Sequence, residues 1–197
     1  AVRISNPAIP DEIKPEVGFD AGTHADEWVA MYLCNQLMRD LVRDYDSDSE
    51  IKALVDSTEI WFYPKVFMDG NSRLNDDDIN INRDWTFTSG STLESQHTIF
   101  AARWIHENRF VYHWTGHDGV ETIGWFSNSQ DATHYKDLAQ RYYAFASYLA
   151  LSGGYASNGW TNSAVHGITG ALSYLVEVHG AHAPARIDSI GPMRYGQ

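Results

Sequence analysis

The stretch from Val17 to Glu27, with the sequence VGFDAGTHADE, decides the fold because strand periodicity gives way there to a turn. Val17, Phe19 and Ala21 alternate with polar or small residues, as side chains do when successive residues point to opposite faces of a sheet. Gly22 ends the alternation and is typical of a turn. The stretch therefore predicts a strand over 17–21, followed by a turn that carries several polar side chains.

A helix is expected directly after this turn. Apolar residues recur at roughly helical spacing before the acidic run 44–50, namely Val29, Met31, Leu33, Leu37, Met38, Leu41 and Val42. The same criteria predict helices over 98–107 and 136–149, and strands over 60–63, 110–114 and 172–178. Pro64 and Gly116 are expected to stop the first two of these strands. Strands that alternate with helices indicate the α/β class, here a single domain in which helices flank a mixed, mostly parallel sheet.

The composition is that of one globular domain, which we take to span residues 1–197. Apolar residues make up 43% of the chain, enough for one core. The 14 basic and 26 acidic residues give a formal net charge of −12, so we expect neither nucleic acid nor anionic membranes as partners. No targeting signal opens the chain and no apolar run is long enough to cross a membrane, so we expect a soluble protein. The composition indicates no particular oligomeric state.

His24 and Glu27 lie in the turn after the first predicted strand. In an open α/β sheet, ligands bind beyond the carboxyl ends of the strands, and these two side chains are three residues apart there. His113 stands at the end of another predicted strand. Two histidines and one glutamate leave a fourth position of zinc open, as in catalytic sites. His117 is kept as a reserve ligand, and the alternative interpretation of His24 and Glu27 is a metal-free helix start at the surface.

Further polar residues point to chemistry around such a metal. Glu177 sits inside an apolar strand, where an acidic side chain is rare unless it is paired or functional, although on an edge strand it would merely face water. Arg73, Asn82 and Arg83 fall in one polar segment and supply donors for a carboxylate and an oxyanion. A solvated loop is the other interpretation of that segment.

Taken together, these residues resemble the zinc metallocarboxypeptidase family of carboxypeptidases A and B. The family pattern is His-x-x-Glu, an Asn-Arg pair, a distal His, and then a Tyr and a Glu, and its ligand set of two His and one Glu is that of carboxypeptidase A. The resemblance covers about Val2 to Gly180 and implies one zinc ion held by His24, Glu27 and His113.

The same resemblance implies roles for the remaining residues. Asn82 and Arg83 match the pair that binds the terminal carboxylate of the substrate, and Arg73, nine positions earlier, matches the arginine that polarises the scissile carbonyl. Tyr155 lies 22 positions before Glu177, the interval between the mobile tyrosine and the general base of the family. Seven residues after this tyrosine, Asn162 falls at the base of the side-chain pocket, which argues mildly against a preference for Lys or Arg.

The expected activity is therefore a zinc-dependent hydrolase that removes C-terminal residues from peptides, with Glu177 as general base. Membership of the family would imply a secreted or periplasmic protein. Two departures from the family are expected: Asn80 stands where the family usually has an Asp beside the first zinc histidine, and we expect no counterpart of the family's first strand and helix in residues 1–197.

Two other functions fit the same residues. One is a related zinc amide hydrolase that acts on acyl-amino acids or on the stem peptides of peptidoglycan. The other is a non-catalytic domain that binds zinc and peptides. The interval between Tyr155 and Glu177 favours peptides as substrates, and the presence of Glu177 favours catalysis, because binding alone needs no buried base.

Overall fold

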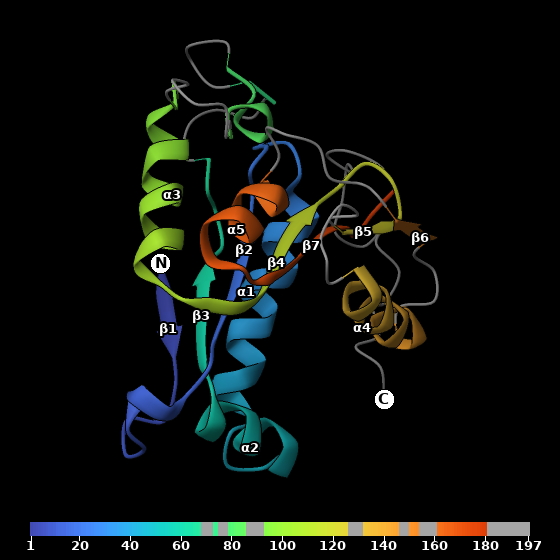
Figure 1. Ribbon diagram of the computed structural model, residues 1–197. Helices are drawn as coiled ribbons and strands as arrows, with labels where there is room; N and C mark the ends of the chain where they lie inside the picture. Colours follow the sequence, from blue (N-terminus) through green and yellow to red (C-terminus); the bar gives the residue numbers. More distant parts are fainter. Residues whose placement is uncertain are drawn as a thin grey trace.

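The computed structural model describes residues 1–67, 73–74, 79–85, 93–125, 132–145, 150–153 and 161–180 (Figure 1). Within these ranges the chain forms one seven-stranded sheet in the order β1-β3-β2-β4-β7-β5-β6. The strands are β1 (Val2–Ile4), β2 (Glu16–Ala21), β3 (Glu59–Tyr63), β4 (Phe110–His117), β5 (Thr122–Trp125), β6 (Ala150–Gly153) and β7 (Leu172–Glu177). β1 pairs with β3 and β5 with β7 in antiparallel fashion, while the other four pairs are parallel. The predicted α/β class with a mixed, mostly parallel sheet is thus confirmed.

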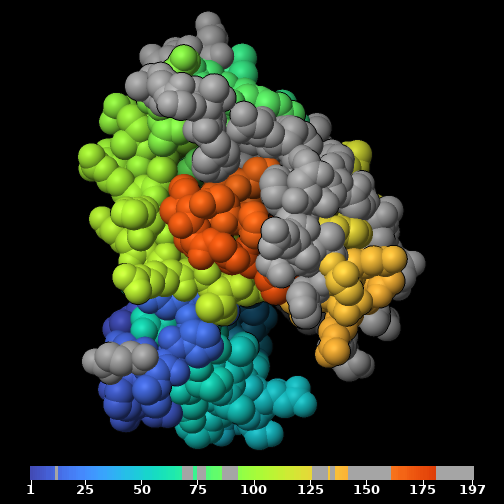
Figure 2. All heavy atoms as spheres, in the orientation of Figure 1, coloured from blue at the N-terminus to red at the C-terminus, as the bar shows by residue number. Residues whose placement is uncertain are grey.

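Helices cover both faces of this sheet. They are α1 (Trp28–Arg43), α2 (Ser49–Ser57), α3 (Gln96–Glu107), α4 (Ala132–Phe145) and α5 (Thr161–Thr169), with two short 3₁₀ segments, η1 (Asp11–Ile13) and η2 (Ile81–Arg83). Buried residues of α1, α2 and α4 join one hydrophobic cluster with the sheet, and buried residues of α3 and α5 join a second one. α3 and α5 lie side by side, as the space-filling view also shows (Figure 2). None of the helices that the structure describes could cross a membrane.

The sequence prediction did not include β1, β5, β6 or α5, and it also differs from the structure at Gly116 and in the acidic run. β4 does not stop before Gly116 but continues to His117. A Cβ atom at Gly116 would collide with the ring of Trp114 and would lie 3.0 Å from Cβ of Ala30, so this glycine permits close packing of α1 on the strand. The acidic run contains the start of α2, where Asp48 accepts hydrogen bonds from the backbone N–H groups of Glu50 and Ile51.

The topology creates one edge at which functional side chains can meet. β2, β4 and β7 are neighbours in the centre of the sheet and run parallel, so their carboxyl ends lie together. In open α/β sheets this edge is where ligands bind. The turn after β2 and the last residues of β4 and β7 are therefore the places to look for a site.

Candidate metal centre

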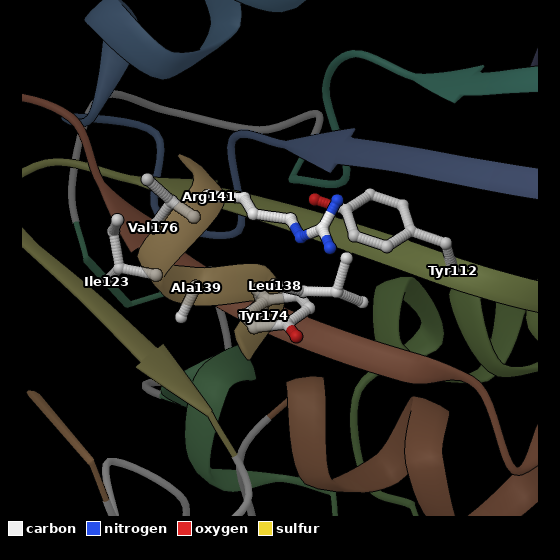
Figure 3. A pocket seen from close by; sticks show the side chains of 7 residues that line it. All are labelled: Tyr112, Ile123, Leu138, Ala139, Arg141, Tyr174 and Val176. Carbon is white, nitrogen blue, oxygen red and sulfur yellow. The ribbon is translucent and has the colours of Figure 1, made fainter. Parts of the chain in front are cut away.

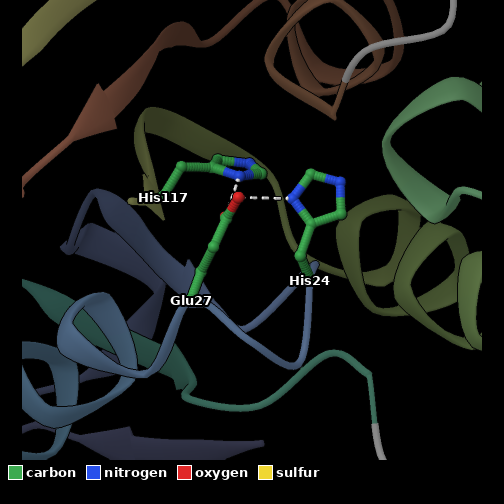
Figure 4. A group of neighbouring side chains, drawn as sticks. All are labelled: His24, Glu27 and His117. Carbon is green, nitrogen blue, oxygen red and sulfur yellow. Dashed lines mark hydrogen bonds and ion pairs between the residues drawn. The ribbon is translucent and has the colours of Figure 1, made fainter. Parts of the chain in front are cut away.

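Three buried side chains converge at this edge of the sheet. His24 and Glu27 come from the turn between β2 and α1, and His117 is the last residue of β4 (Figure 4). Nδ1 of His24 lies 2.7 Å from Oε1 of Glu27, and Nδ1 of His117 lies 2.6 Å from Oε2 of the same carboxylate. The three side chains are at most 2% exposed, and their candidate ligand atoms all lie within 4.8 Å of one another. This group could hold one metal ion.

The turn that carries His24 and Glu27 is fixed by its backbone. Gly22 has a positive φ of 68°, a conformation that favours glycine, and a Cβ atom there would lie 2.7 Å from the sulfur of Met31. The carbonyl groups of Ala21 and Gly22 accept hydrogen bonds from the N–H groups of Val66 and Phe67. The chain after β3 therefore holds the turn in place, and the ligand pair with it.

The second nitrogen of His24 is also occupied in a way that suits metal binding. Nε2 of His24 lies 3.0 Å from Oδ1 of Asn80, which can only accept a hydrogen bond. This arrangement favours the tautomer with the proton on Nε2 and leaves the lone pair of Nδ1 directed at Glu27 and His117. The donor set of two imidazole nitrogens and one carboxylate is that of an open zinc site, so the residues fit the metal.

Glu27 and the two histidines form a charged group in which a bound cation could take the place of the positive charge on His117. Burial opposes ionisation of Glu27, but the charge and the hydrogen bond of His117, together with the contact of His24, outweigh it and hold the pKa of Glu27 far below its usual range. Burial opposes protonation of His117, yet the charge and hydrogen bond of Glu27 raise the pKa of His117 above its ordinary value. Burial lowers the pKa of His24. The protein thus keeps one carboxylate ionised and draws positive charge to it, which a divalent cation would supply directly.

The prediction of His113 as the third ligand is corrected by this geometry. His113 is fully buried within the sheet, with Nε2 3.0 Å from Oδ2 of Asp20 and Nδ1 3.4 Å from Oγ of Ser173. His113 and His117 share one face of β4, because they are four residues apart, but that spacing separates them by about 13 Å along a strand. Only His117 reaches the edge where His24 and Glu27 lie.

The structure brings both predicted catalytic residues to the metal group. Glu177 is the last residue of β7 and lies in register with His117 on β4, and its charge contributes to the raised pKa of His117. Nη2 of Arg73 lies 3.2 Å from Oε1 of Glu27 and 3.3 Å from Nδ1 of His24. A carboxylate and a guanidinium therefore flank the three ligands.

The predicted substrate residues occupy the segment around η2 and the start of α5. Oδ1 of Asn82 accepts hydrogen bonds from the backbone N–H and the hydroxyl of Thr161, at 3.1 and 3.2 Å. The Asp84 carboxylate accepts bonds from the N–H groups of Glu94 and Ser95, just before α3. Between these two anchors the side chain of Arg83 is exposed, and its Nη1 donates to the carbonyl oxygen of Asn82.

The two other predicted substrate residues are Asn162, which is buried, and Tyr155. Asn162 is fully buried near the start of α5, and neither polar atom of its side chain has a hydrogen-bond partner among the described residues. A buried, unsatisfied amide is unusual and is the kind of group that a ligand can satisfy. Tyr155 lies outside the described residues.

An apolar pocket of about 250 Å³ lies elsewhere, between the sheet and α4 (Figure 3). It is lined by Tyr112, Ile123, Leu138, Ala139, Arg141, Tyr174 and Val176. Of the predicted site residues that the structure describes, none belongs to this lining. The candidate metal ligands therefore lie at the edge of the sheet and not in this pocket.

Comparisons with known proteins agree with the geometry. The family model described as zinc carboxypeptidase matches residues 1–177. A zinc carboxypeptidase of Saccharothrix mutabilis subsp. capreolus is 42% identical over 65 residues, 33% of this chain and 15% of that protein. Carboxypeptidase M of Mus musculus is 29% identical over 134 residues, 60% of this chain and 30% of that protein.

Among solved structures, a metallo-carboxypeptidase from Burkholderia cenocepacia has a TM-score of 0.76 at 17% identity, and the match covers 99% of this chain and 54% of that one. Carboxypeptidase A from Helicoverpa armigera also has a TM-score of 0.76 at 17% identity, covering 94% of this chain and 57% of that one. The fold is thus shared, and this chain spans about half the length of these structures.

Proposed function

The chain belongs to the zinc carboxypeptidase family, and we propose that it removes C-terminal residues from peptides with one zinc ion held by His24, Glu27 and His117. The observation that carries this proposal is the convergence of the three ligands with Glu177 in register beside His117. A carboxylate next to an open metal site supports hydrolysis, because it can accept a proton from an attacking water. Binding of metal alone would not require it.

Zinc, when bound, polarises a carbonyl group and lowers the pKa of water. Glu177 would take the proton of the attacking water and later give it to the departing amine. Arg73, already beside Glu27 and His24, would donate hydrogen bonds to the carbonyl oxygen as negative charge develops on it. The two residues thus divide proton transfer and charge stabilisation between them.

Arg83 would select the end of the peptide. A guanidinium binds a carboxylate through two parallel hydrogen bonds, and the anchors at Asn82 and Asp84 hold the backbone on either side of Arg83. Asn80, three residues before Arg83, contacts His24, so the segment that would bind the carboxylate is connected directly to the metal group. This connection supports cleavage at the last peptide bond rather than at an internal one.

Asn162 and Tyr155 complete the proposal. The buried amide of Asn162, which has no hydrogen-bond partner within the part of the chain that the structure describes, would face the side chain of the terminal residue and would favour an uncharged one. Tyr155 would close over the bound peptide, a role that rests on the family resemblance alone. A secreted or periplasmic location has the same support.

The deciding experiment is mass-spectrometric analysis of a peptide panel, each peptide with a free and an amidated C-terminus, incubated with the zinc-loaded protein. Loss of single terminal residues from the free acids only is the expected result. E177Q should abolish this turnover and keep zinc, while E107Q, at an exposed glutamate of α3, should behave as the unchanged protein.

Other outcomes of this experiment separate the alternatives. Cleavage of acyl-amino acids or of peptidoglycan stem peptides, with none of ordinary peptides, would identify the related amide hydrolase. Stoichiometric zinc with peptide binding but no cleavage of any substrate would identify a binding domain. Unchanged turnover by E177Q would refute Glu177 as the base.

A further inference from the structure

We infer that Asp118 is a positioning residue of the metal centre: by capping helix α1 in place of Glu27, it holds the two ligands Glu27 and His117 at binding distance. The inference rests on the proposed zinc site. It assigns a function to a buried acidic residue that takes no part in the hydrolysis described above.

Helix α1 begins without a cap of its own. Glu27 occupies the N-cap position, yet its side chain accepts no hydrogen bond from the helix. Its carboxylate is instead turned toward His24 and His117. The first N–H groups of a helix have no partner within the helix, so a ligand at this position leaves them to be satisfied from elsewhere.

Asp118 supplies the missing acceptor from a distant part of the chain. Its side chain is fully buried, and Oδ2 accepts a hydrogen bond of 2.9 Å from the backbone N–H of Val29, 89 residues away in sequence. The neighbouring N–H of Ala30 favours the ionised form of this carboxylate. The Asp118 side chain thus satisfies an N–H group of the first turn of α1.

The position of Asp118 joins the two ligands. It directly follows His117, and Val29 lies two residues after Glu27. On either side of Asp118 the backbone is tied to the segment after β7, because the His117 carbonyl accepts from the Val178 N–H and the Gly119 N–H donates to the His179 carbonyl. The backbone at Asp118 is therefore fixed, and the hydrogen bond of its side chain to α1 sets the distance between His117 and the helix that begins directly after Glu27.

A simple helix cap is the competing explanation, and the chain contains a matched control for it. Asp48 caps α2 in the same manner, accepting from two backbone N–H groups at 2.8 and 3.1 Å, and it belongs to neither the metal group nor its surroundings. Removal of either cap should lower stability. Only removal of Asp118 should also change the affinity for metal.

The test measures the zinc affinity of the full chain by competition with a chromophoric chelator, and the melting temperature of each metal-free variant. We expect D118A to weaken zinc binding by about 10- to 100-fold, the range typical of residues that orient metal ligands. D118N retains an acceptor oxygen at the same place and should stay within about threefold of the unchanged protein. D48A should lower the melting temperature and leave zinc affinity unchanged.

The outcomes are distinct. If the unchanged protein binds no zinc, the proposed function fails. If it binds zinc and D118A binds equally well while melting at a lower temperature, Asp118 is only a helix cap and this inference alone is overturned. If D118A does not fold, D118S takes its place. The serine hydroxyl ends short of the position of the Asp118 carboxylate, so D118S should also bind zinc more weakly. A zinc affinity of D118S equal to that of D118N would overturn the inference.

Discussion

Nε2 of His24 lies 3.0 Å from Oδ1 of Asn80, and the same oxygen accepts a hydrogen bond from the Asn82 N–H at 3.0 Å. Asn80 therefore orients a metal ligand and caps the η2 segment at once. An amide oxygen carries less negative charge than a carboxylate, so it makes the imidazole a weaker ligand than an aspartate would.

The first prediction follows from this contact. N80D should strengthen zinc binding several-fold, because it places a carboxylate behind His24, and N80A should weaken it by about 10- to 100-fold. Chelator competition at one pH measures both. A weaker zinc affinity in N80D than in the unchanged protein would show that the geometry of the contact between residue 80 and His24, and not the charge of residue 80, limits zinc binding.

The second prediction concerns the two histidines of β4. H117A should lose the single zinc ion, because His117 provides one of the three ligands, whereas H113A should keep one zinc per chain and lose stability, because it leaves the carboxylate of Asp20 without its histidine. Zinc content after dialysis, together with chemical denaturation, measures both effects. Retention of zinc by H117A with its loss in H113A would reverse the assignment.

The sequence could predict the strand, turn and helix around His24 and Glu27, because periodicity and the glycine turn are local signals. It could not choose between His113 and His117. Both lie on the same face of one strand, and the choice depends on where β4 ends. Gly116 indicated that the strand would end early. The reason for a glycine at this position is instead a tertiary contact, the close packing of Trp114 and Ala30, which no local sequence pattern contains.

The same difference between local signals and tertiary contacts applies to residues outside the three ligands. Glu177 could be proposed from the sequence because an acidic residue in an apolar strand is a local anomaly. Asp118 was missed, because its significance comes from a hydrogen bond to Val29, 89 residues away. Contacts of that separation depend on the assembled sheet, and a single sequence gives no signal for them.

The third prediction concerns pH. The pKa of folded His117 is raised above its ordinary value of 6.5, so its stabilising contribution is complete below pH 6.5 and is lost as the pH rises through the folded pKa. Burial raises the pKa of Asp118 to about 7, so its cost to stability grows as the pH rises from 3.8 to about 7. The lowered pKa of His24 costs stability only below pH 6.5. From pH 6.5 upward, the metal-free protein should therefore become less stable.

Zinc should reverse this trend, because metal ligands bind in their deprotonated forms and protons compete with the ion. The melting temperature of the zinc-loaded protein minus that of the chelator-treated protein should increase between pH 6.5 and 8. In the H117A variant the difference should be small at every pH. A difference that narrows with rising pH would contradict the charge states assigned to this group.

The last prediction tests the packing beneath the metal centre. Gly18 on β2 lies opposite His113, and a Cβ atom at Gly18 would lie 2.7 Å from Cδ2 of His113 and 3.0 Å from Cζ of Phe110. G18A should therefore lower the free energy of unfolding by about 1–3 kcal/mol, the usual cost of overpacking a core. The same substitution in the H113A background should cost less, because the nearest atom is gone, although the contact with Phe110 persists.

Chemical denaturation of the four proteins in this cycle gives the coupling energy between the two sites, which we expect to be about 1 kcal/mol in magnitude. G180A is the matched control, because a Cβ atom there meets its nearest neighbour at 3.4 Å and should change little. Equal costs of G18A in both backgrounds would show that His113 moves aside freely. In that case the contact of His113 with Asp20 would not fix the distance between β2 and β4. The metal ligands at the carboxyl ends of these two strands would then be aligned by the backbone pairing of the strands alone.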